Sequence, residues 1–85
     1  MKIFYVEKFK REYSKLSPDI KKHAEEKERL FRKNPFDPQL KTHKLHGILK
    51  GFWAFSIHYR YRIIFEFAGK ENVRFYSVGD HDIYE

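Results

Sequence analysis

The stretch that decides the fold is WAFSIHYRYRIIFEF, residues 53–67. In it, large apolar side chains alternate with smaller or polar ones on both sides of a bend near Tyr59-Arg60. Alternation with a period of two is typical of a half-buried β-strand. The stretch therefore predicts two strands that fold back on each other. Their shared apolar face consists of Trp53, Phe55 and Ile57 before the bend and Tyr61, Ile63, Phe65 and Phe67 after it.

One further strand is predicted on each side of this pair in the sequence. Residues 68–72 (AGKEN) have the composition of a hairpin loop, and residues 73–78 (VRFYSV) favour a strand. The pair and this third strand fit an antiparallel meander. Residues 2–6 (KIFYV) are also strand-favouring, and we expect them at an edge of the same sheet.

The first third of the chain predicts a helical hairpin. Phe9, Tyr13 and Leu16 recur at the spacing of a short amphipathic helix. Ser17-Pro18-Asp19 then provides an N-cap, a first-turn proline and an acid at the positive end of a second helix, which Asn34-Pro35 ends. The buried stripe of the second helix is expected to contain Ile20, Ala24, Lys27 by its stem, Leu30 and Phe31.

These elements predict an α+β fold in which an N-terminal strand and a helical hairpin pack on a twisted antiparallel sheet. Residues 36–40 are expected to form a connector, residues 41–51 a loop or irregular strand, and residues 79–84 a short tail. The pattern shows no internal boundary, so residues 1–85 are predicted to form a single domain.

Composition excludes several classes of protein. A length of 85 residues is too short for a two-domain enzyme with its own nucleotide-binding fold, and an aromatic content of 19% is too high for a disordered chain. The absence of cysteine removes disulfides, thiolate metal sites and cysteine nucleophiles. No apolar run approaches the roughly 20 residues that span a bilayer. We expect a soluble cytoplasmic protein without contact to a membrane.

The charge of the chain is unevenly distributed. The formal net charge is +6, and residues 38–65 contain no Asp or Glu. Around the helices, by contrast, Lys and Arg alternate with Glu as on an ordinary solvated surface. The acid-free interval is therefore the expected functional region. It contains the cations Lys41, Lys44, Lys50, Arg60 and Arg62, the histidines His43, His46 and His58, and six aromatic residues from Phe52 to Phe65.

The residue types of this interval suit RNA cleavage by a 2′-hydroxyl. That reaction needs a base for the 2′ proton, cations for the charge on the phosphate and an acid for the leaving 5′ oxygen. Histidine titrates near neutrality, arginine binds two phosphate oxygens, and aromatic rings stack on unpaired bases. The route requires neither a metal nor a cofactor. A zinc site is not expected, because His43-x-x-His46 is the one metal-like spacing and it has no cysteine beside it.

The candidate residues come from the acid-free interval and from the C-terminus. Each has an ordinary structural interpretation as well: His81 can be a turn residue after Gly79, Arg62 can point to solvent, and Tyr84 can pack the end of the chain. The candidate catalytic residues are His81, Arg62, His46, His43 and Tyr84, and the candidate RNA-binding residues are Lys41, Lys44, Lys50, Arg60 and Tyr61.

Three segments give the sequence a family resemblance. They are residues 44–53 (KLHGILKGFW), residues 61–65 (YRIIF) and residues 78–84 (VGDHDIY). In this order they resemble the RelE/ParE toxin superfamily, the toxins of type II toxin–antitoxin modules that are often labelled plasmid-stabilisation proteins. The predicted strand and helical hairpin occur in the family's order too, so the resemblance covers nearly the whole chain.

The resemblance implies an endoribonuclease that cleaves mRNA, usually in the ribosomal A site, and leaves a 2′,3′-cyclic phosphate. It also implies a cognate antitoxin that covers the basic surface, and contact with operator DNA only through the toxin–antitoxin complex. Arg62 matches the family's strand arginine at the scissile phosphate, and His81 matches the C-terminal histidine of the YafQ- and YoeB-like branches. Tyr84 falls near a terminal aromatic position, and His43 resembles a loop histidine of the YafQ-like branch.

Two departures from the family pattern leave the acid and base unassigned. The acidic residue that the YafQ-like branch has before its central strand is absent, because Tyr59-Arg60-Tyr61 stands there. The loop glutamate of the YoeB-like branch is replaced by Lys44 or His46. Two other functions remain open: ParE-like members share the fold but inhibit DNA gyrase, and the chain can also be a non-catalytic basic RNA-binding module.

Overall fold

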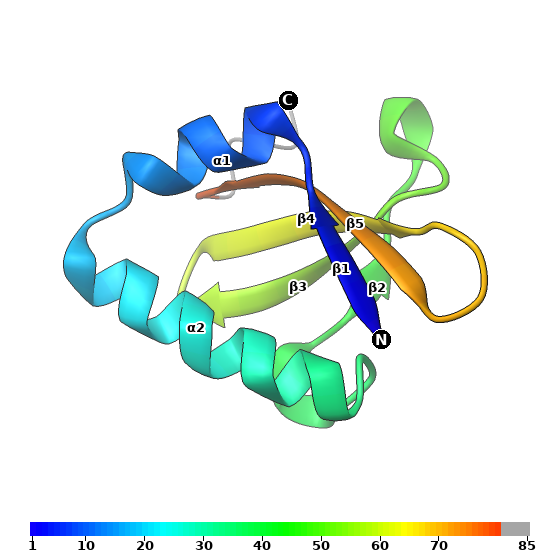
Figure 1. Ribbon diagram of the computed structural model, residues 1–85, viewed down its shortest axis with the longest axis horizontal. Helices are drawn as coiled ribbons and strands as arrows, with labels where there is room; N and C mark the ends of the chain where they lie inside the picture. Colours follow the sequence, from blue (N-terminus) through cyan, green and yellow to red (C-terminus); the bar gives the residue numbers. More distant parts are fainter. Residues whose placement is uncertain (81–85) are drawn as a thin grey trace.

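The computed structural model describes residues 1–80 of the chain, in which two helices and a five-stranded sheet form an α+β fold (Figure 1). The strand order is β1-β5-β4-β3-β2. In chain order the elements are β1 (Lys2–Tyr5), α1 (Glu7–Ser14), α2 (Pro18–Lys33), the 3-10 turn η1 (Pro38–Leu40), β2 (His43–Lys44), the 3-10 turn η2 (Gly47–Leu49), β3 (Trp53–His58), β4 (Tyr61–Phe67) and β5 (Asn72–Gly79).

The predicted meander is confirmed, and one part of the predicted sheet is different. Strands β3, β4 and β5 pair antiparallel in sequence order, and β2 pairs antiparallel with β3. The edge strand β1, however, lies parallel to β5, with Ile3 opposite Val73. The sheet is therefore mixed and not wholly antiparallel. Parallel pairing needs a long crossover, and the two helices between β1 and the remaining strands provide it.

Helix α2 begins and ends where the local sequence directs it. The hydroxyl of Ser17 accepts a hydrogen bond from the backbone N–H of Ile20, and Pro18 occupies the first turn of α2. The helix ends at Lys33 because Pro35 forces Asn34 into an extended conformation. α1 is one short amphipathic helix whose buried residue is Phe9.

The core lies between the helices and one face of the sheet. Phe31 of α2 stacks on Phe55 with ring centroids 4.7 Å apart, and its edges contact Phe65 and Phe75. All four rings are fully buried. The alternation in residues 53–67 thus directs every second side chain toward the helices, as predicted. This aromatic cluster allows a small chain to bury enough apolar surface without disulfides.

Within residues 1–80 no helix has the length and apolarity required to cross a membrane.

Candidate functional site

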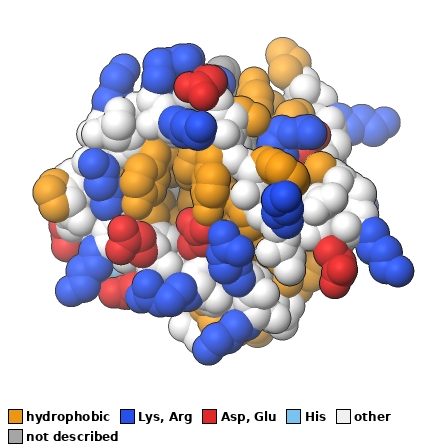
Figure 2. Space-filling view, in the orientation of Figure 1, with side chains coloured by type: hydrophobic (Ala, Val, Ile, Leu, Met, Phe, Trp, Pro, Cys, Tyr) orange, Lys and Arg blue, Asp and Glu red, His pale blue; other side chains and the backbone are white. Residues whose placement is uncertain are grey.

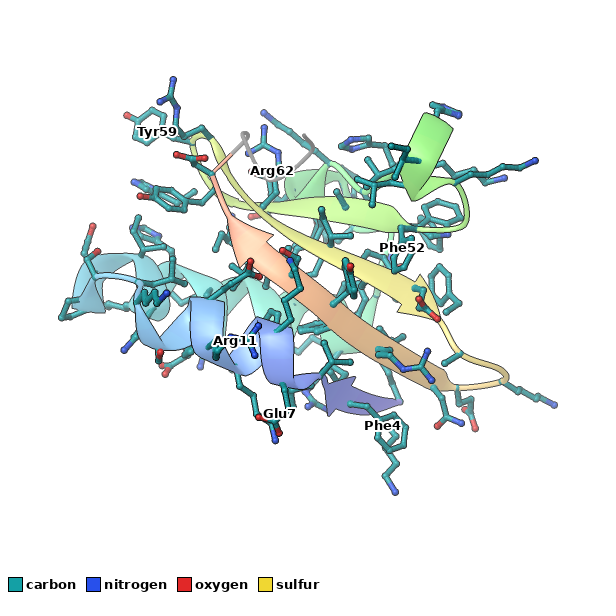
Figure 3. All side chains as sticks on the ribbon, turned by 90° about the horizontal axis from the view of Figure 1, so that it is seen from above. Phe4, Glu7, Arg11, Phe52, Tyr59 and Arg62 are labelled. Atoms are coloured by element: carbon teal, nitrogen blue, oxygen red, sulfur yellow. The ribbon has the colours of Figure 1, made fainter. Side chains whose placement is uncertain are left out.

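Arg62 projects from the face of the sheet that the helices do not cover. Its neighbours in β4, Tyr61 and Ile63, face the helices, so alternation directs Arg62 to the opposite side, as Figure 3 shows. We call this side the distal face and define it by His43, Ala54, Ser56, Arg62 and Ile64. Residues directly opposite each other on antiparallel strands share a face, and the register pairs His43 with Ala54, Ala54 with Ile64, and Ser56 with Arg62.

The guanidinium group of Arg62 is held by one of its nitrogen atoms. Nη1 donates hydrogen bonds to Ser56 Oγ at 3.3 Å, to the Tyr61 carbonyl at 3.1 Å and to the Tyr59 carbonyl. Tyr59 adopts a left-handed conformation (φ 46°) in the turn between β3 and β4, which directs its carbonyl to the arginine. Within residues 1–80, Nε and Nη2 of Arg62 have no hydrogen-bond partner. As far as the described residues are concerned, both nitrogens are available to bind an anion in the bidentate manner of arginine.

His43 is the candidate histidine that shares the distal face with Arg62. It is exposed in β2, and its Nδ1 lies 3.0 Å from the Lys41 carbonyl oxygen. The sheet register places it two strands and two residues away from Arg62, which corresponds to about 12 Å between Cα atoms at ordinary strand spacing. The two side chains are therefore too far apart for mutual contact and suitably placed to contact one extended ligand between them.

A basic and aromatic cleft lies next to His43. It has a volume of about 500 Å³ and is formed by the segment that leads from β2 through η2 into β3. The structure thus brings together three of the predicted site residues, His46, Lys44 and Lys50. Gly51, with a φ of 96°, provides the left-handed turn that returns the chain to β3. The lining residues are Lys44, Leu45, His46, Lys50, Gly51, Phe52 and Trp53.

Aromatic side chains extend this surface across the sheet. Phe52 packs against Tyr76 of β5 with ring centroids 4.9 Å apart. The Lys8 ammonium group of α1 lies 4.9 Å from the centre of the Tyr76 ring. Glu66, an acid on this side, is paired with Arg74 at 2.6 Å, so its charge is neutralised locally. The surface beside Arg62 therefore combines cations with partly exposed rings.

The remaining predicted residues are distributed more widely. Tyr61 packs against the core and Lys44 extends over the Trp53 ring, so both lie toward the helix side of the sheet. Arg60 is exposed in the turn between β3 and β4. Lys41 lines a separate cleft with Ser56 and His58. Two candidate catalytic residues, His81 and Tyr84, lie outside the described residues.

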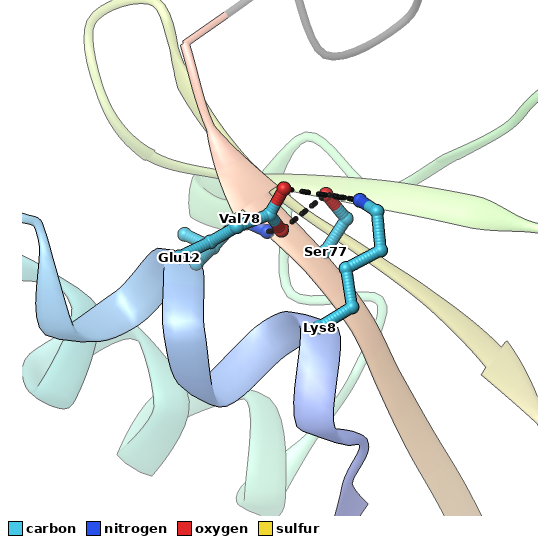
Figure 4. A network of polar contacts seen from close by, with 4 residues as sticks. All are labelled: Lys8, Glu12, Ser77 and Val78. Atoms are coloured by element: carbon cyan, nitrogen blue, oxygen red, sulfur yellow. Dashed lines mark hydrogen bonds and ion pairs between the residues drawn. The ribbon is translucent and has the colours of Figure 1, made fainter.

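One polar cluster was not anticipated from the sequence. The Glu12 carboxylate accepts hydrogen bonds from the Ser77 hydroxyl at 2.7 Å and the Val78 backbone N–H at 3.1 Å, and Lys8 contacts both Glu12 and Ser77 (Figure 4). β1 pairs with β5 only as far as Phe75. Beyond that point the Glu12 carboxylate takes the place of a neighbouring strand, because it accepts the hydrogen bond of the Val78 backbone N–H. Burial raises the pKa of Glu12, but the hydrogen bonds from Ser77, Lys8 and Val78 outweigh it and leave the pKa below its usual value. The sequence shows that Lys8 and Glu12 are spaced for an ion pair along one helix. No sequence pattern indicates that Glu12 contacts β5.

A groove with an apolar floor lies between the two helices. Figure 2 shows hydrophobic side chains exposed between α1 and α2, with charged residues on both margins. The groove has a volume of about 540 Å³, and its apolar floor is formed by Tyr5, Phe9 and Tyr13. Among residues 1–80, none of the candidate catalytic residues lines it.

Comparison of the sequence with family models and with curated proteins finds no match. Solved structures do match. The YoeB/ParE toxin from Agrobacterium tumefaciens has a TM-score of 0.78 at 17% identity, over 95% of this chain and 99% of that one. YafQ from E. coli strain BL21(DE3) has a TM-score of 0.77 at 21% identity, over 95% and 93%. The YoeB–YefM complex from Staphylococcus aureus has a TM-score of 0.76 at 16% identity, over 95% and 97%. The chain therefore has the RelE/ParE-like fold of the YoeB and YafQ toxins.

Proposed function

We propose that this chain is the toxin of a type II toxin–antitoxin module and that it is an endoribonuclease. The observation that supports this most directly is the half-satisfied guanidinium of Arg62, on a sheet face that also presents His43 and is bordered by Lys50, His46 and the Phe52–Tyr76 pair. The fold shared with YoeB and YafQ agrees with it.

In the proposed reaction, Arg62 binds the scissile phosphate. A 2′-hydroxyl attacks the adjacent phosphorus, the bond to the 5′ oxygen breaks, and the products are a 2′,3′-cyclic phosphate and a 5′-hydroxyl end. Nε and Nη2 of Arg62 stabilise the charge that develops on the phosphate oxygens. A histidine takes the 2′ proton and a second group donates a proton to the leaving oxygen. His43, His46, His81 and Tyr84 are the candidates for these two roles.

The bordering residues would position the RNA. Lys50 provides a phosphate contact, Lys44 adds a positive charge to the cleft from the helix side, and Phe52 and Tyr76 provide rings on which a base can stack. Lys41 and Arg60 extend the positive surface, and Tyr61 supports it from the core side. We propose that the ribosome presents the mRNA to this surface.

The proposed partner is an antitoxin that neutralises this surface. Solved structures with the same fold include the YoeB–YefM toxin–antitoxin complex from Staphylococcus aureus and the E. coli DinJ–YafQ complex. We propose that a cognate antitoxin binds this chain in the cytoplasm and that operator DNA is bound only through that complex.

Primer extension on translated mRNA tests the proposal. Purified wild-type protein should create new 5′ ends in ribosome-bound message, and Arg62→Ala should reduce their rate of formation by about 100-fold or more. Arg11→Ala is the matched control, because it removes an equal charge from an exposed position on α1 (Figure 3). Intact mRNA with the wild-type protein refutes the nuclease, and inhibition of gyrase supercoiling in the same preparation would identify the ParE-like function instead.

A further inference from the structure

Three potential metal ligands meet on the helix side of the sheet, away from Arg62. They are Asp19 and His23 of α2 and His58, the last residue of β3. Each offers one ligand atom, and the three atoms lie within 4.8 Å of one another. Within residues 1–80, the His43-x-x-His46 pair has no third ligand at comparable distance. The metal-like spacing in the sequence is that of His43 and His46, whereas the fold brings His23 and His58 together.

The local structure explains why these three residues converge. Asp19 and His23 are four residues apart and so lie on the same side of α2, one turn apart. The turn between β3 and β4 lies over the first half of α2 (Figure 1), and His58 precedes that turn. The rings of His23 and His58 stack with centroids 3.9 Å apart and planes 10° apart. Both histidines are partly exposed, so an ion can reach them from solvent.

We propose that Asp19, His23 and His58 bind a divalent transition-metal ion of the zinc type, with water as a further ligand. Two imidazole nitrogens and one carboxylate suit Zn²⁺, whereas Mg²⁺ and Ca²⁺ prefer sites made of oxygen atoms. Lys27 and Lys41 line the cleft beside the two histidines. The affinity of the site therefore comes from chelation and not from an excess of negative charge.

Binding requires a small rearrangement. Zinc lies about 2.1 Å from each ligand, which brings ligand atoms to about 3.4 Å from one another. The lone pair of an imidazole lies in the plane of its ring, so two parallel stacked rings cannot both direct a nitrogen to one ion. The rings must turn about their side-chain bonds, and loss of the His23–His58 stack is a consequence of binding that can be measured.

The ion would join α2 to the turn that holds Arg62. His58 is followed by Tyr59, and the Tyr59 carbonyl accepts a hydrogen bond from Arg62 Nη1. A ligand bond at His58 restricts this turn from the helix side of the sheet. The site is a structural clamp in this proposal, and it supplies no group to the reaction proposed at the distal face.

Calorimetric titration with ZnCl₂ tests the site without reference to RNA cleavage. We expect saturable binding of one ion per chain, at least about tenfold weaker in His23→Gln and in His58→Gln, and no binding of Mg²⁺. The matched control is the triple variant His43→Gln/His46→Gln/His81→Gln, which removes the other three of the five histidines and should bind as the wild type does. Circular dichroism establishes that each variant is folded.

Imidazole NMR and amide hydrogen exchange locate the ion. On addition of ZnCl₂ the ring resonances of His23 and His58 should shift, and exchange of the amides at residues 59–62 should slow. Three results overturn the proposal: no saturable binding, equal binding in His23→Gln and His58→Gln, or loss of binding in the triple variant. The last result would place the ion among the other histidines.

Discussion

The helix-covered face of the sheet and its distal face are formed by alternate residues of the same strands, yet the covered face is aromatic and apolar, whereas the distal face presents charged and polar side chains beside the buried Ala54 and Ile64. The covered face buries the rings of Phe55, Phe65 and Phe75 against Phe31, with no exposed surface on any of them. The distal face presents Ser56, Arg62 and Glu66. Arg62 donates hydrogen bonds to Ser56 and to the backbone, and Glu66 accepts one from Arg74. We therefore expect stability to be separable from the proposed RNA cleavage in this small chain, because alternate residues of β3 and β4 face the core and the distal side.

The largest expected effect is a loss of stability when a ring of the covered face is removed. Phe31→Ala removes a fully buried ring that contacts three others, and we expect a loss of about 3–5 kcal/mol in the free energy of unfolding. Urea unfolding followed by circular dichroism measures it. Phe36→Ala is the control, since that ring is about half exposed and should cost much less. Equal losses in the two variants would contradict the assignment of Phe31 to the centre of the core.

The next effect is on activity and concerns two adjacent residues. His43 shares the distal face with Arg62, whereas Lys44 extends over Trp53 on the other side. For a proton-transfer role, we expect His43→Gln to slow RNA cleavage by about 100-fold and Lys44→Gln to slow it by less than about tenfold. Single-turnover cleavage rates measure both. The reverse order would show that the register does not decide which side chain reaches the RNA.

Acidic pH should destabilise the fold through Glu12, whose carboxylate links α1 to β5. The folded-state pKa of Glu12 is below the value of an ordinary glutamate, about 4.5, so its ionised form stabilises the fold above that pH. This contribution is lost as the pH falls through the lower folded-state pKa. Glu12→Gln should cost about 1–2 kcal/mol at pH 7 and less at pH 3. Unfolding by urea at both values measures it, and Glu7→Gln, a largely exposed control, should change neither.

The smallest effect concerns the ion pair on the distal face. Arg74 and Glu66 form a contact of 2.6 Å at partly exposed positions, and such pairs stabilise proteins by less than about 1 kcal/mol. We expect Arg74→Gln to lower the melting temperature by a few degrees at most. A large loss, measured by thermal unfolding, would show that the distal face contributes substantially to stability and would weaken the contrast between the two faces.

The sequence predicted the elements well because their causes are local. Alternation in residues 53–67 predicts β3 and β4, and Ser17-Pro18 and Asn34-Pro35 predict the ends of α2. The parallel direction of β1 was missed, since nothing within residues 2–6 records which strand they pair with. Likewise, Glu12 meets Ser77 and His23 meets His58 through tertiary packing alone.

The candidate site could be predicted only in part, because the face that each side chain occupies depends on strand pairing. Composition and the family resemblance made Arg62 and the basic interval candidates, but only strand register separates His43, on the distal face, from Lys44 and Tyr61, on the other side. The one-residue offset between neighbours of a strand decides which face each occupies. A list of suitable residue types cannot contain that information.

The measurement that tests the central claim most directly combines activity and stability in one variant. The rate of RNA cleavage and the free energy of unfolding are determined on the same preparation of Arg62→Ala. The separation of the two faces predicts a rate at least about 100-fold below that of the wild type, with stability within about 1–2 kcal/mol of it. Cleavage at the wild-type rate, or a loss of cleavage explained by unfolding, would contradict the claim.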